Sequence, residues 1–121
     1  MMMPKRSFTI ALFALGWLLL IPRMALAHAH LMASKPAANA TVQGPDVAIE
    51  LRYNSRVDGH HSVITLVRPD NQTQTLALDR QSAAMNLNAH VTLRPGHYTI
   101  RWQALSTDGH LTRGEIPFTV R

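Results

Sequence analysis

The sequence predicts an all-β protein whose folded part is one antiparallel sandwich or barrel of about seven short strands. Apolar and polar residues alternate with a period of two along several stretches, whereas the period of an amphipathic helix is nearly absent. Glycine, proline, asparagine and aspartate separate these stretches at short intervals. Many short strands with frequent turns are typical of sandwiches and barrels.

Three strands are expected in the first part of the domain. The first is short and covers residues 30–34. The second, 47–53, has hydrophobic residues at alternate positions, which predicts one buried face: Val47, Ile49, Leu51 and Tyr53. The third, 62–67, is apolar along most of its length and ends at a turn-forming run, 68–71.

Four further strands are expected after this turn. Residues 75–79 and 89–93 form two short strands, and a tight turn follows at 94–96. The strand 98–104 then places alternate residues on one face: Tyr98, Ile100, Trp102 and Ala104. The last strand, 116–120, alternates in the same way.

The order of these strands predicts which loops share an end of the fold. Hairpin-linked strands place their loops alternately at the two ends of a sandwich. In a Greek-key order, the loops 54–61 and 106–113 lie at the same end, together with the start of the first strand. Three histidine-bearing segments, including the one with His28, are therefore expected to meet there.

Residues 1–27 have the features of a secretory signal peptide. Lys5 and Arg6 form a basic start, and residues 8–21 are a run of 14 residues without a charge. This run is shorter than the ~18–20 residues that a membrane-spanning helix needs. A cleaved signal peptide is therefore favoured over an uncleaved membrane anchor.

Cleavage is expected immediately before His28, because Ala25 and Ala27 supply the small residues that a signal peptidase reads. The mature chain is then a single domain, 28–121, located in the periplasm and without further membrane insertion. Its 94 residues can bury one core but hardly two. The chain has no cysteine, which excludes disulfides and thiolate metal sites.

The charge of the mature chain does not predict a nucleic-acid partner. The whole sequence has 12 basic and 7 acidic residues, and cleavage removes three of the basic ones. Nine basic residues against seven acidic ones leave a formal charge of only +2. No basic run exists, and the arginines are spread singly along the strands, as solvent-facing charges are.

Cleavage before His28 would give the protein a metal-chelating amino end. The free α-amine and the imidazole Nδ1 of the same residue can close a six-membered ring on one metal ion. An α-amine ordinarily has a pKa of about 7.7–8.0, so a metal can displace its proton near neutral pH. Two nitrogens fixed in one plane suit the tetragonal geometry that Cu(II) prefers.

A second half of a metal site is expected at Asp108-Gly109-His110. Side chains at i and i+2 project to the same side of an extended segment, and the glycine lets that segment bend. One imidazole and one carboxylate would extend the two nitrogens of His28 to an N3O set. The carboxylate has two possible roles, as a direct ligand or as a group that orients an imidazole. The motif alone is compatible with an ordinary Asp-Gly turn, but together with His28 it favours a metal site.

Motifs along the whole mature chain occur together with these candidates: His28-Ala29-His30-Leu31, Ser34-Lys35-Pro36-Ala37, Leu93-Arg94-Pro95-Gly96-His97-Tyr98, Trp102, Ser106, Asp108-Gly109-His110, and Gly114 with Phe118-Thr119-Val120. In this combination the chain resembles the CopC-type periplasmic copper-binding proteins. The resemblance implies an immunoglobulin-like β-sandwich that carries copper in homeostasis or resistance. It implies one Cu(II) per chain, held by His28, Asp108 and His110. The usual partner in this family is a CopD-type inner-membrane protein.

The chain departs from some members of that family in one loop. Those members hold Cu(I) in a methionine-rich loop, but the corresponding stretch here, 68–74, has neither Met nor His. Cu(I) requires soft thioether ligands. Met32 and Met85 are far apart in sequence and are expected to fill gaps in the core. A Cu(II)-only protein is therefore predicted.

The other histidines are given smaller roles. His30 is near His28 in sequence, but a surface or outer position is favoured over a direct bond to the metal. The loop 58–61 repeats the Asp-Gly-His string. A solvated turn is favoured there, and an auxiliary copper-capture site at His60 and His61 is the sharper hypothesis. Surface positions are expected for His90 and His97.

These features predict a copper-binding carrier or buffer without enzymatic activity. One alternative is a small redox enzyme with a copper brace, which also uses an N-terminal histidine. The chain is small for that role and lacks an extended aromatic surface for a polymer. A carboxylate ligand would also stabilise Cu(II) against reduction. The other alternative is a metal-free immunoglobulin-like interaction module, because a fold does not fix a function.

Overall fold

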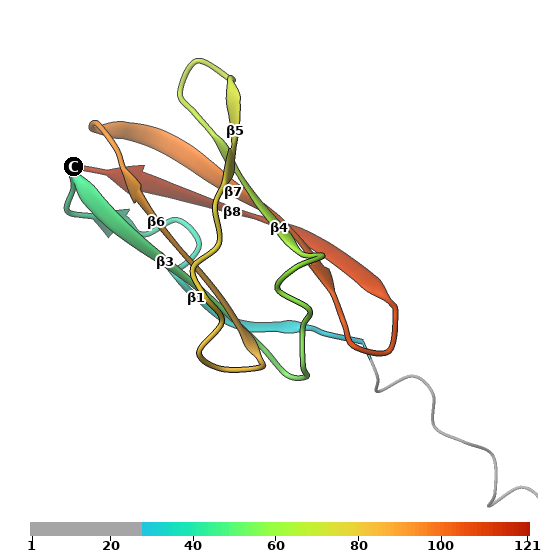
Figure 1. The fold of residues 1–121 in the computed structure, drawn as a ribbon. Coiled ribbons are helices and arrows are strands. Elements are labelled where there is room, and N and C mark those ends of the chain that lie inside the picture. Colours follow the sequence, from blue (N-terminus) through green and yellow to red (C-terminus); the bar gives the residue numbers. More distant parts are fainter. Residues whose placement is uncertain (1–27) are drawn as a thin grey trace, which may run out of the picture.

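The computed structural model describes residues 28–121, and the predicted signal peptide, 1–27, lies outside these described residues. The described part contains eight strands and no helix (Figure 1). The strands are β1 (Leu31–Lys35), β2 (Thr41–Val42), β3 (Asp46–Tyr53), β4 (Val63–Val67), β5 (Thr73–Leu76), β6 (Asn86–Thr92), β7 (Gly96–Leu105) and β8 (Leu111–Val120). The predicted all-β class is confirmed.

The strands form two sheets that enclose the core. The smaller sheet has the order β1-β3-β6, and the larger has the order β2-β8-β7-β4-β5. Strand pairs are antiparallel except for β2 and β8, which run parallel. The chain passes from one sheet to the other between β3 and β4 and returns at β6, as in immunoglobulin-like Greek keys. The predicted sandwich is confirmed, with eight strands in place of about seven.

A tyrosine near the start of β7 provides a local sign of the same architecture. The hydroxyl of Tyr98 donates a hydrogen bond of 2.8 Å to the carbonyl oxygen of Arg94. Immunoglobulin-like sandwiches use such a tyrosine corner to fix the chain as it enters the corresponding strand. The bond holds the turn that aligns β7 with its neighbours.

Three predicted strands were wrong in extent, and one was missed. The strand predicted at 89–93 is β6, which begins at Asn86 and ends at Thr92. β5 begins and ends earlier than the predicted 75–79, because the turn before it closes early through a 2.8 Å bond from Arg68 N–H to Gln72 O. β8 starts at Leu111, five residues before the predicted start. The prediction missed this first part because its inward positions, 112 and 114, carry polar and small residues and show no hydrophobic alternation. β2 has only two residues, too few to show any periodicity. It exists through its pairing with the end of β8.

The core lies between the sheets and uses the alternating residues that the sequence indicated. The inward residues of β3 and β7 are all buried: Val47, Ile49, Leu51, Tyr53, Tyr98, Ile100, Trp102 and Ala104. Near one end of this core the rings of Tyr53 and Trp102 meet edge to face, with centroids 5.3 Å apart. Burial raises the pKa of the Tyr53 phenol far above its ordinary value, so this residue stays neutral.

Gly114 leaves room for the Trp102 indole, which leads to a prediction. A Cβ atom at position 114 would lie 2.5 Å from Cζ2 of Trp102, and this rigid ring is only 6% exposed. Gly114→Ala should therefore destabilise the fold by about 1–3 kcal/mol, the usual cost of overpacking a core. Thermal unfolding followed by circular dichroism measures the change.

A neighbouring substitution serves as the control. Glu115 is the next residue on β8, faces solvent, and contacts the Arg101 Nε at 3.1 Å with both side chains more than half exposed. Glu115→Ala should leave the melting temperature nearly unchanged, because exposed ion pairs contribute little. Equal melting temperatures for the two variants would show that the Trp102 packing tolerates a methyl group.

In the part of the chain from 28 to 121, no helix is long and apolar enough to cross a membrane.

Candidate metal centre

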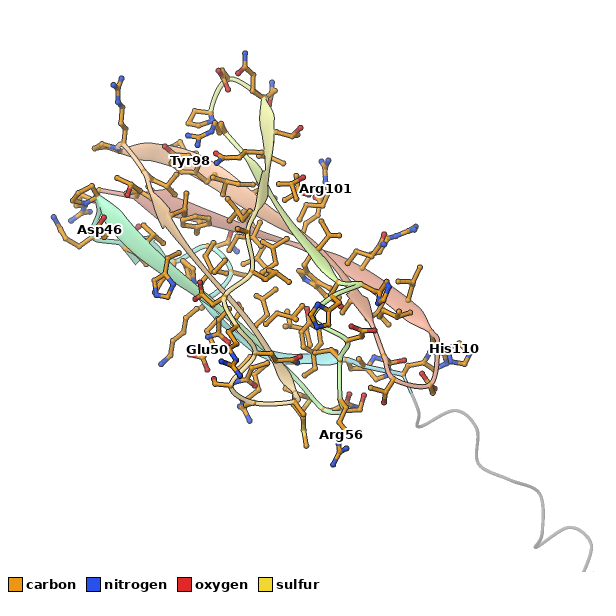
Figure 2. All side chains as sticks on the ribbon, viewed as in Figure 1. Asp46, Glu50, Arg56, Tyr98, Arg101 and His110 are labelled. Carbon is orange, nitrogen blue, oxygen red and sulfur yellow. The ribbon has the colours of Figure 1, made fainter. Side chains whose placement is uncertain are left out.

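Two loops and the start of the described chain meet at one end of the sandwich. The loop between β3 and β4 is bonded to the end of β7 and to the loop after it: Asp58 N–H donates to Leu105 O over 2.8 Å, and Thr107 N–H donates to Arg56 O over 3.2 Å. His110 lies at the end of the second loop, directly before β8 (Figure 2). The ring of His28 contacts it. The predicted meeting of three histidine-bearing segments is confirmed.

The rings of His28 and His110 are spaced as two neighbouring ligands of one metal ion would be. Their centroids are 4.3 Å apart, and their planes are inclined by 64°. Imidazole–metal bonds are about 2.0–2.1 Å long, so two imidazoles at right angles around an ion have centroids roughly 4.5 Å apart. His28 is half-buried and the His110 side chain is 51% exposed, which leaves the pair accessible to an ion from solvent.

A closed turn presents Asp108 and His110 together. Gly109, between them, has a φ of 92°, in the left-handed region that favours glycine. Its N–H donates a 2.9 Å hydrogen bond to the carbonyl of Ser106, and the N–H of Ser106 donates one of 2.9 Å to the carbonyl of His110. These two backbone bonds hold the turn and bring the carboxylate against the imidazole.

Ser106 is a buried residue that holds this turn through its hydroxyl group, a role that the sequence did not predict. It is 2% exposed, and its hydroxyl donates to Oδ1 of Asp108 while accepting a 3.3 Å bond from the N–H of His110. The bond from Ser106 is the main cause that lowers the pKa of Asp108, and bonds from His110 add to it. Serine is common in turns, so its type alone gave no signal of this contact.

The contact between Asp108 and His110 determines which ring nitrogen can bind a metal. Nδ1 of His110 lies 3.0 Å from Oδ2 of Asp108. An ionised carboxylate only accepts hydrogen bonds, so Nδ1 donates and Nε2 keeps its lone pair. Of the two roles considered for Asp108, this geometry supports the orienting one.

Side chains alone do not complete a metal site. Among the described residues, no three or more His, Asp or Glu side chains are grouped so that they could hold an ion. The missing donor in the predicted set is the α-amine of His28, which exists only when the bond to Ala27 has been cut. In the uncut chain that nitrogen is an amide, whose lone pair is delocalised into the carbonyl. The donor set therefore depends on cleavage at this bond.

His30 and the second Asp-His loop lie outside the close pair. The His30 ring is 6.4 Å from the His28 ring, and the residue is exposed. In the loop 58–61, Oδ2 of Asp58 lies 2.8 Å from Nδ1 of His61. This bond is the main cause that lowers the pKa of Asp58. The Asp-His contact is thus repeated, but no third side chain within residues 28–121 completes a group around it.

The remaining histidines and the methionines lie at the surface. His90 contacts Asp79 at 2.6 Å with its side chain 71% exposed, in line with its predicted surface position. Met32 and Met85 were expected in the core, which is wrong, since they are 61% and 46% exposed. Met32 lies where the register of β1 shifts, and Met85 lies in the loop before β6, so neither points into the sandwich.

Comparisons with known proteins point to one family. The family model described as the CopC domain matches residues 31–121. Protein YobA of Escherichia coli strain K12 is 35% identical over 120 residues, 96% of this chain and 96% of that protein. Copper resistance protein C of Pseudomonas syringae pv. tomato is 28% identical over 129 residues, 99% of this chain and 100% of that protein. The crystal structure of CopC from Methylosinus trichosporium OB3b matches with a TM-score of 0.71 at 25% identity, over 77% of this chain and 93% of that one.

Proposed function

Because the chain belongs to the CopC family, we propose that it is a periplasmic protein that binds one Cu(II) ion at a site formed by His28, Asp108 and His110. It acts as a carrier or buffer in copper homeostasis or resistance. The family and its copper resistance and copper transport relatives support a copper-related function. The chain is not an enzyme, as proteins of this family bind and carry copper.

The observation that carries the proposal is the 4.3 Å spacing of the His28 and His110 rings, together with the 3.0 Å contact between His110 Nδ1 and the Asp108 carboxylate. After cleavage, the amine and Nδ1 of His28 and Nε2 of His110 supply three nitrogens. The carboxylate of Asp108 fixes the His110 ring and places a negative charge beside the site. Nitrogen donors with an adjacent carboxylate suit tetragonal Cu(II).

Accessibility supports a role in exchange. The His110 and Asp108 side chains are 51% and 30% exposed. An ion held at the rim of a sandwich by a chain end and one loop can be passed on without unfolding. A CopD-type inner-membrane protein is the recipient or donor that the family resemblance implies. The periplasm follows from the predicted export of the chain.

Titration of the protein that begins at His28 tests the proposal. We expect one Cu(II) per chain, with a d–d absorption band and an EPR spectrum of tetragonal nitrogen and oxygen ligation. Affinity should fall as the solution is acidified, because protons compete for the amine and imidazole nitrogens. The pKa of Asp108 is lowered, so its carboxylate stays charged over that range and does not itself cause the release.

Two further experiments could contradict the proposal. If the protein takes up no copper in equilibrium dialysis against Cu(II), it is a metal-free immunoglobulin-like interaction module. Oxidised product after incubation of the copper-loaded protein with reductant and peroxide would indicate a copper-brace enzyme. We expect copper uptake and no oxidised product.

A further inference from the structure

The residue next to the proposed chelating end is held in the core. Ala29 is 0% exposed and belongs to the buried cluster, although it is only the second residue of the predicted mature chain. Its carbonyl oxygen accepts a 2.8 Å hydrogen bond from the hydroxyl of Thr112. Chain ends are generally poorly ordered unless they are tied down. Here a buried methyl group and a side-chain hydrogen bond tie the end down.

Asn54 holds His30, the residue after Ala29, through both the N–H and the carbonyl group of His30. The N–H of His30 donates to Oδ1 of Asn54 over 2.8 Å, and the N–H of Asn54 donates to the carbonyl of His30 over 3.0 Å. Three hydrogen bonds therefore hold residues 29 and 30. His28 extends directly from this anchored backbone.

Thr112 links the two halves of the copper site. It lies on β8 two residues after His110 and pairs with the buried Ala104 of β7. Its hydrogen bond to Ala29 spans 83 positions in the sequence. The strand that directly follows His110 is thereby joined to the segment that carries His28.

We propose that Thr112 is a positioning residue for copper binding, with Asn54 as a second support, an inference that rests on the proposed function. Thr112 acts through Ala29 and does not touch the ion. By holding the chain end in place before the metal arrives, it reduces the ordering that binding must otherwise impose. Partners that orient metal ligands typically change affinity by about 10–100-fold.

Two substitutions at one position test the role of the hydroxyl. Thr112→Val replaces the hydroxyl by a methyl group of similar volume, and Thr112→Ser keeps the hydroxyl. In proteins that begin at His28, Thr112→Val should lower the Cu(II) affinity by about 10-fold or more at unchanged stoichiometry. Thr112→Ser should stay close to the parent protein.

A readout without copper separates positioning from general stability. In NMR spectra of the metal-free protein, Thr112→Val should lose the nuclear Overhauser contact between the His28 and His110 rings. The amide of His30 should also exchange faster with solvent. Asn54→Ala, which removes the acceptor of that amide, should show the same pair of changes and a similar loss of affinity.

Unchanged affinity and a persisting ring contact in Thr112→Val would overturn the inference. If thermal melting shows that Thr112→Val does not fold, Thr112→Ala takes its place in the comparison, and Asn54→Ala tests the second support separately. A parent protein that takes up no copper would instead refute the proposed function. The ring contact and the His30 exchange rate in the metal-free variants would then still decide whether Thr112 positions the chain end.

Discussion

Addition of one methionine before His28 should weaken Cu(II) binding by more than about 100-fold, beyond the 10–100-fold that outer partners of a metal site contribute. The extension converts the α-amine of His28 into an amide and so removes one ligand and the chelate ring together. The nearest described side chains offer no replacement, because they form no group of three that could hold an ion. Competition titration with a Cu(II) chelator of known affinity measures the loss.

The same comparison needs a fold control. The extended protein should melt at nearly the temperature of the protein that begins at His28, since the anchored residue Ala29 is unchanged. Acetylation of the amino end should reproduce the loss of affinity. If either blocked protein bound copper as tightly as the free-amine form, the chelate would have no part in binding.

Removal of the His110 imidazole should have an effect of similar size. His110→Ala deletes the ring that lies 4.3 Å from His28, so Cu(II) affinity should again fall by more than about 100-fold. Asp108→Asn keeps the shape of the side chain but removes the charge and the acceptor for Nδ1 at Oδ2. It should cost about 10–100-fold, the range of groups that orient a ligand.

The second Asp-His loop provides the matched control for this series. His61 has the same Nδ1 contact with an aspartate, at 2.8 Å from Asp58, but among the described residues no third His, Asp or Glu completes a group with this pair. A variant with alanine at both His60 and His61 should keep the one-to-one Cu(II) site. If that variant lost the strong Cu(II) site while His110→Ala kept it, the copper would be bound at the loop 58–61, and the proposed site at His110 would be contradicted.

The fold was predictable wherever burial imposes a period of two. Along β3, alternation from Val47 to Tyr53 gives the inward face directly, because one side of the strand meets the core. β8 was harder, since its inward positions 112 and 114 carry Thr and Gly, and Gly114 is small only because Trp102 occupies the space beside it. That relation is a contact across the sheet, and no local pattern reveals it.

The candidate site, like the fold, was predictable only in part. His28 and Asp108-Gly109-His110 were identifiable because their donor atoms are chemically distinctive and strand order brings their segments to one end. Ser106 and Thr112 carry ordinary hydroxyl groups whose partners are fixed only by the fold. Thr112 acquires its role from a bond to Ala29 across the molecule. The proposed ligands could thus be identified from their chemistry, whereas the groups that contact them could be found only in the folded structure.

Mass spectrometry of the protein recovered from the periplasm of copper-grown cells, under conditions that preserve bound metal, is the most direct test. We expect the mass of a chain that runs from His28 to Arg121 with one copper ion attached. A mature chain that starts at any other residue, or one that starts at His28 and carries no copper, would contradict a copper site built on the liberated amino end.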